Sequence, residues 1–115
     1  MSDALRVLEY LDRAGQSPFA RWFTTLNAAA AAKVTIALYR LGQGNLSNVK
    51  GVGAGVFEYK IDFGPGYRIY FGKDSDRIII LLGGSDKRGQ ATAIGKAHDA
   101  WAAYKKRKSK ASNEE

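Results

Sequence analysis

The chain has 115 residues, 45% of them hydrophobic and none of them cysteine, a composition typical of one globular domain that excludes disulfides and thiolate metal sites. Eighteen lysines and arginines against eleven acidic residues leave a net charge of +7, which favours a polyanionic partner. The longest apolar run is far shorter than a membrane span and the first residues lack the regions of a signal peptide, so we expect a cytoplasmic protein without a membrane partner.

The first half of the chain predicts one strand and two helices. Residues 5–11 alternate in the manner of a strand. The Ser-Pro pair at 17–18 is a helix start, with the serine as cap, and predicts a short helix over 18–26. Asn27 can cap a second helix over about 28–41, which has an apolar stripe at helical spacing.

The second half predicts a loop, three strands and a helix. Residues 42–55 contain five glycines and one basic residue, Lys50, and are assigned to a loop. The last helix begins near residue 88 or 92, ends near residue 106 and buries one apolar stripe. The strands between them are expected at about 56–63, 67–73 and 77–82.

Helices followed by a run of strands indicate an α+β domain over residues 1–104. The sheet is expected to be an antiparallel meander that also includes the first strand. Residues 78–82 are apolar at every position, which is typical of a central strand covered on both faces. We expect the two N-terminal helices to pack on one face and the other face to be open toward the C-terminal helix.

Residues 105–115 form a separate basic segment, with five lysines and arginines and two glutamates, a net charge of +3. We predict a disordered C-terminal tail. The charge fits either contacts with the phosphates of a polyanion or a merely solubilising end, and the sequence favours neither.

The hairpin around the Gly-Pro-Gly turn at 64–66 carries the most information about function. Pairing across a three-residue loop places Asp62 opposite Arg68 and Lys60 opposite Tyr70. One face of the hairpin is then apolar, and the other gathers cations, carboxylates and a phenol on a rigid scaffold.

Arg68 is the strongest single candidate, because a strand arginine that faces away from the core offers a fixed fork of donors for a phosphate. The alternative is a cross-strand salt bridge to Asp62. Lys60 lies on the same face and could neutralise a phosphoryl group or carry a proton. The alternative for Lys60 is a solvated sheet face with alternating charges.

Lys87 and Arg88 follow a strand end and the glycine pair 83–84, where the backbone could approach an anionic ligand closely. The spacing does not match a nucleotide-binding P-loop. His98 is the only histidine and is expected at the boundary of the last helix, not as a catalyst. No cluster suggests a metal site, and we expect no metal and no cofactor.

The run GVFEYKIDFGPGYRIYF at 55–71, followed by LLGG at 81–84, Asp86-Lys87 and Gln90, resembles the HigB-like addiction module killer proteins of the RelE/ParE toxin superfamily. The resemblance covers about residues 5–104. It implies a RelE/ParE-like fold and the toxin of a type II toxin–antitoxin pair. Such a toxin is a metal-independent endoribonuclease that cuts mRNA, usually on the ribosome, and a helix-turn-helix antitoxin neutralises it.

The resemblance also implies site residues. Arg68 occupies the arginine of the Gly-Tyr-Arg strand motif, Lys60 a basic position on the preceding strand, and Lys87 the basic position after the third strand. These three are the expected catalytic residues. The expected contacts to nucleic acid beyond them are Lys50, Arg88 and Tyr70.

The sequence departs from the family pattern at three places. A lysine stands at position 60 where many members have arginine, and Asp62 stands where some relatives carry a second lysine. No tyrosine follows Arg88 closely, so Tyr70 is the substitute considered for the proton donor. These departures keep two alternatives open, namely a ParE-like inhibitor of DNA gyrase without hydrolytic activity, and a catalytically inactive or phage-derived remnant.

Overall fold

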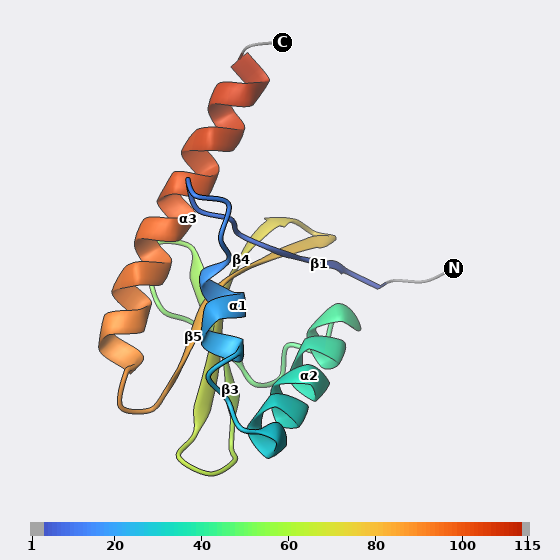
Figure 1. Ribbon diagram of the computed structural model, residues 1–115. Coiled ribbons are helices and arrows are strands. Elements are labelled where there is room, and N and C mark those ends of the chain that lie inside the picture. The colour runs from blue at the N-terminus through green and yellow to red at the C-terminus, as the bar shows by residue number, and fades with distance from the viewer. Residues whose placement is uncertain (1–3, 114–115) are drawn as a thin grey trace.

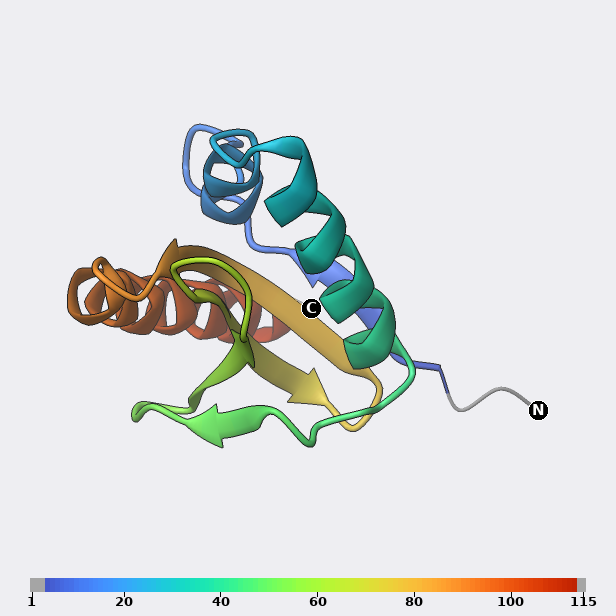
Figure 2. The ribbon, with the colours of Figure 1, turned by 90° about the horizontal axis from the view of Figure 1, so that it is seen from below.

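A mixed sheet with helices on both of its faces forms the body of the protein in this computed structural model (Figures 1 and 2). The structure describes residues 4–113, which form five strands and three helices. The strands are β1 Arg6–Glu9, β2 Val49–Gly51, β3 Val56–Ile61, β4 Tyr67–Ser75 and β5 Ile78–Asp86. The helices are α1 Pro18–Phe23, α2 Ala28–Gly42 and α3 Gln90–Asn113.

The strand order is β1-β5-β4-β3-β2, with β1 parallel to β5 and every other neighbouring pair antiparallel. This confirms the predicted α+β class and the place of the first strand in the same sheet. The sheet is an antiparallel meander, as predicted, only from β2 to β5, because β1 joins β5 in parallel. One strand was missed, because the loop predicted over 42–55 contains β2. That strand is only three residues long and ends in a glycine, too short to show a period of two.

The two faces of the sheet carry separate cores (Figure 2). Helices α1 and α2 cover one face, as predicted, and α3 covers the other. Strand β5 serves both, since Ile79 and Leu81 join the first core while Ile80 and Leu82 join the second. The prediction of a central strand covered on both faces is confirmed. Among residues 4–113, no helix is both long and apolar enough to cross a membrane.

Both predicted caps are present. The Ser17 side chain accepts a hydrogen bond from the Ala20 amide at 3.0 Å, and the Asn27 side chain accepts one from the Ala30 amide at 2.8 Å. Helix α1 nevertheless ends at Phe23 and is shorter than the helix predicted to residue 26.

Helix α3 is longer than predicted and continues to Asn113. The predicted end near residue 106 is wrong, and residues 105–113, which were assigned to a disordered tail, extend the helix. Lysine and arginine dominate this stretch and are good helix formers. Tertiary contacts also anchor it, because Arg107 donates to the Leu11 carbonyl at 2.9 Å and Lys108 pairs with Asp74.

The register of the β3–β4 hairpin differs from the prediction by two residues. Lys60 lies opposite Arg68 and Glu58 opposite Tyr70, because residues 62–66 all belong to the turn. The Gly66 amide donates to the Phe63 carbonyl at 2.9 Å, so the turn is closed inside this wider loop. A shift of two residues leaves every side chain on its predicted face, so the partners were wrong but the faces were right.

Candidate functional site

A hollow of about 330 Å³ lies beside the turn that joins β3 and β4. It brings together the three residues predicted as catalytic, each from a different part of the sheet. Lys60 comes from β3, Arg68 from β4 and Lys87 from the segment after β5. The backbone amide of Lys87 donates to the Gly66 carbonyl at 3.0 Å and so joins this segment to the turn. The rest of the lining consists of Asp62, Phe63, Gly64, Pro65 and Gly66.

Arg68 is buried, with only 6% of its surface exposed. Its Nε lies 3.5 Å from Glu58 Oε1, and within residues 4–113 its buried Nε and Nη1 have no hydrogen-bond partner. Nη1 lies next to Gly66, where even a Cβ atom would come within 3.4 Å. Buried donors without acceptors are costly. Phosphate oxygens are acceptors that suit the guanidinium fork.

Glu58 holds Arg68 in place and was missed as a site residue. It is 1% exposed and also accepts a hydrogen bond from Gln90 Nε2 at 2.8 Å. Lys50 Nζ lies 3.9 Å from the same carboxylate. The carboxylate therefore ties β2, β3, β4 and the start of α3 together. The alternation placed Glu58 on the polar face, but only the structure shows that α3 covers it.

Tyr70 is completely buried, with 0% exposure, so its predicted contact with nucleic acid is wrong. Its hydroxyl lies 3.0 Å from Ser85 Oγ inside the core beneath α3. Burial is the main cause that raises the pKa of Tyr70 above its ordinary value. The phenol is thus kept from solvent, and it does not line the hollow.

The remaining predicted cations are exposed. Lys60 lies 3.6 Å from Asp62 Oδ1, with about half of its side chain in solvent, and Lys87 stands at the rim of the hollow. Lys50 joins the site only through Glu58, and Arg88 is exposed but does not line the hollow. The structure thus offers one buried guanidinium and two exposed ammonium groups.

Two other predicted features have structural roles. The glycine at position 84 accommodates the Trp22 ring, with which a Cβ would collide, so it provides room for packing and not for a ligand. His98 is half-buried, as expected of a boundary residue, and its Nε2 lies 2.9 Å from the Val52 carbonyl. Within the described part of the chain, no group of three His, Cys, Asp or Glu residues is placed to hold a metal ion.

Comparison with known proteins finds a relative in Haemophilus influenzae (strain ATCC 51907 / DSM 11121 / KW20 / Rd), described as an "Uncharacterized protein". It is 40% identical over 80 residues, which cover 69% of this chain and 81% of the relative. No family model matches the chain.

Proposed function

We propose that this chain, which belongs to the same family as the Haemophilus influenzae protein, is a HigB-like toxin of a type II toxin–antitoxin system with a RelE/ParE-like fold. In this proposal it cleaves mRNA, bound on the ribosome, as an endoribonuclease that needs no metal. The support comes from the residues of the β3–β4 hollow and from the sequence resemblance.

The observation that carries the proposal is the convergence of Lys60, Arg68 and Lys87 on one hollow. Arg68 presents buried donors without a partner within residues 4–113, and the two lysines add charge that remains accessible. A phosphodiester fits this set, because its nonbridging oxygens can accept from the guanidinium while an ammonium group neutralises the second negative charge that develops on them in the transition state.

The proposed reaction uses the RNA itself as nucleophile. The 2′-hydroxyl gives up its proton to solvent as its oxygen attacks phosphorus, the bond from phosphorus to the 5′-oxygen breaks, and the leaving oxygen takes up a proton from solvent. The products are a 2′,3′-cyclic phosphate and a free 5′-hydroxyl. Arg68 and Lys60 hold the phosphoryl oxygens on which charge develops, and Lys87 neutralises them from the opposite side of the hollow. Preorganised charge of this kind stabilises the transition state without a metal. DNA lacks the 2′-hydroxyl and is not a substrate.

A cognate antitoxin is part of the proposal. A toxin that persists in its own host must be held inactive, and an acidic or amphipathic segment laid across a basic surface achieves this most simply. We assign this role to a small helix-turn-helix protein.

The test is induction of the isolated gene, with mapping of mRNA 5′ ends and an assay of plasmid supercoiling. We expect growth arrest and new 5′ ends. Lys60→Ala, Lys87→Ala and Arg68→Lys should each lower cleavage more than tenfold, since a charge-assisted contact contributes about 1.5–3 kcal/mol. Arg77→Ala, at an exposed position between β4 and β5, is the matched control.

Arg68→Lys is preferred to Arg68→Ala because it keeps a positive charge beside the buried Glu58. If these variants fold normally and remain as toxic as the parent, the assignment of the catalytic site to the β3–β4 hollow is wrong. Altered supercoiling without RNA cleavage would identify the gyrase-inhibiting alternative instead.

A further inference from the structure

The C-terminal half of α3 projects beyond the sheet and carries a dense set of cations (Figure 1). All of them are exposed: Lys105, Lys106, Arg107, Lys108 and Lys110. Lys108 pairs with Asp74, but among residues 4–113 no carboxylate forms an ion pair with the other four. The charge of this helical segment is therefore largely uncompensated.

A hollow of about 840 Å³ lies between this part of α3 and the loop that follows β1. We call it the α3 groove. Its charged lining residues are Arg13, Lys106, Arg107, Lys110, Asp12 and Asp99. Four cations thus face two carboxylates.

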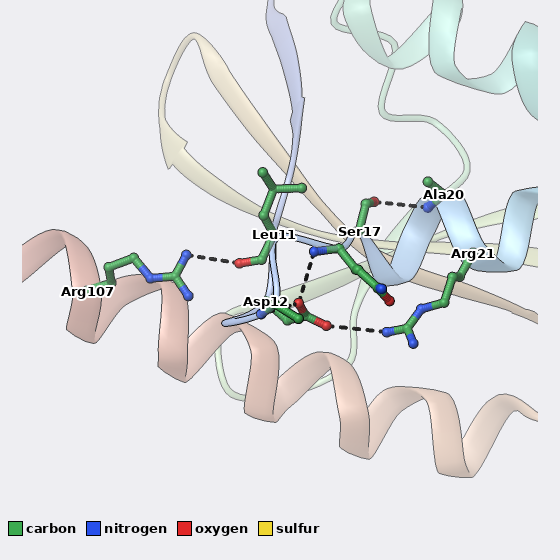
Figure 3. A network of polar contacts seen from close by, with 8 residues as sticks. Leu11, Asp12, Ser17, Ala20, Arg21 and Arg107 are labelled. Carbon is green, nitrogen blue, oxygen red and sulfur yellow. Dashed lines mark hydrogen bonds and ion pairs between the residues drawn. The ribbon is translucent and has the colours of Figure 1, made fainter.

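The loop side of the α3 groove is held in a fixed shape (Figure 3). Arg107 donates to the Leu11 carbonyl at 2.9 Å, and its guanidinium lies over the Tyr10 ring. Asp12 accepts from the Gln16 amide at 3.0 Å and pairs with Arg21 at 3.4 Å. Arg21 thus offsets the charge of Asp12, and Asp99 is the other carboxylate among the described residues that line the groove.

We infer that the α3 groove binds the sugar–phosphate backbone of RNA. Lys106 and Lys110 lie one helical turn apart, about 6 Å along the axis, so both can contact one stretch of backbone. The C-terminal half of α3, which lines the groove, extends away from the β3–β4 turn (Figure 1). The groove is thus a second RNA contact, separate from the hollow that holds Arg68. The choice of RNA as the polyanion rests on the proposed function.

The chemistry of the groove favours RNA over a membrane surface. An interfacial helix needs large apolar side chains opposite its basic face. Outside its charged groups, the groove is lined mainly by small residues, Ala14, Ala100 and Ala103, and residues 105–110 contain no large apolar side chain. Phosphate contacts need only cations held at suitable positions.

The test measures binding of the full chain to a single-stranded RNA with methylated 2′-hydroxyls, which this chemistry cannot cut. Affinity is recorded over a range of salt concentrations. The groove variant combines Arg13→Gln, Lys106→Gln and Lys110→Gln and leaves Arg107 in place to hold the loop. The control variant removes three exposed cations elsewhere, by Arg40→Gln, Arg77→Gln and Lys96→Gln.

We expect the groove variant to bind the RNA at least about tenfold more weakly at moderate salt. The slope of log affinity against log salt should also become shallower by about 2, because each of the three lost phosphate contacts contributes about 0.7 to its magnitude. The control variant should change the slope by less than half as much. Equal effects of the two variants would overturn the inference, because net charge alone would then explain binding. An unchanged groove variant with an unchanged melting temperature would overturn it as well.

The same variants separate this inference from the proposed function. If the groove variant loses affinity for RNA while the parent cleaves no ordinary RNA in any assay, the inference about the groove is supported and the proposed ribonuclease activity is wrong. If the groove variant binds RNA normally and Lys60→Ala abolishes cleavage, the proposed ribonuclease activity is supported and the inference about the groove is wrong.

Discussion

The Arg68 guanidinium lies below the surface of the hairpin, between the Glu58 carboxylate and Gly66. Lys60 and Lys87 reach solvent on the same side. Burying a charged pair costs desolvation energy that the ion pair itself often does not recover. A buried arginine loses less side-chain entropy on meeting a ligand than an exposed lysine does. The pair therefore suits a role in orienting Arg68 toward the hollow.

Replacing Glu58 by glutamine tests this role. The change leaves the Arg68 charge buried without a carboxylate, while the new amide oxygen can still accept from Gln90. We expect the free energy of unfolding to fall by about 3–5 kcal/mol, the usual loss when one partner of a buried pair is removed. Urea unfolding followed by circular dichroism measures it.

Two further variants control this experiment. Glu9→Gln, on the exposed edge strand β1, should change stability by less than about 0.5 kcal/mol. Adding Arg68→Gln to Glu58→Gln should restore part of the loss, because both charges are then absent. A Glu58→Gln protein as stable as the parent would contradict the ion pair as the support of Arg68.

At the scale of elements, local chemistry made part of the fold predictable. The caps Ser17 and Asn27 act through neighbours three residues away, so the sequence shows them directly. The faces of β3 and β4 follow from alternation, which is why Lys60 and Arg68 were placed together on one face. The shift of the register by two residues did not disturb this result.

Features that depend on distant contacts could not be predicted. The carboxylate of Glu58 meets Gln90, which is 32 residues away, and α3 reaches across the sheet to cover Tyr70. Alternation cannot show which polar face a helix will cover. In the same way, α3 contacts Leu11 from 96 residues away, and this anchor of the helix beyond residue 106 cannot be found from the helix-forming residues alone.

Asp74 anchors the far end of α3, and its pH dependence can be predicted. The hydrogen bond from Lys108 lowers the pKa of Asp74 below its ordinary value of 3.8, and the hydrogen bond from Tyr104 acts in the same direction. A depressed folded pKa gives stability that is present above the ordinary pKa and is lost as the pH falls through the folded value.

We therefore expect Asp74→Asn to be less stable than the parent at neutral pH, by about 1–2 kcal/mol given the exposure of Lys108. The difference should shrink as the pH falls below about 4. Urea unfolding across a pH series measures it, with Asp76→Asn in the turn that follows β4 as the control. A difference that does not change with pH would mean that Asp74 acts through packing and not through its charge.

For the whole molecule, the distribution of charge matters more than its total of +7. One basic site lies at the β3–β4 turn and a second at the exposed end of α3, at opposite ends of a molecule whose longest extent is 46 Å (Figure 1). Two separated basic sites let one polyanion be held at two points, which raises the effective concentration of the second contact.

The last prediction concerns the antitoxin at this scale. In the proposed function the partner covers the β3–β4 hollow, so Lys60→Glu and Lys87→Glu should weaken the toxin–antitoxin complex. Arg68 is buried and is left unchanged in this test. Each reversal places like charges together and should weaken binding by about tenfold or more, mainly where the segment from the partner is acidic.

Calorimetric titration of the purified partners measures this effect, with Arg77→Glu between β4 and β5 as the matched reversal away from the hollow. Protection mapping of lysines in the complex provides a second readout, because direct masking should hide Lys60 and Lys87 from modification. If both lysines react as fast in the complex as in the free toxin, direct masking is wrong. Inhibition must then come from a partner bound elsewhere that sterically blocks entry to the ribosome.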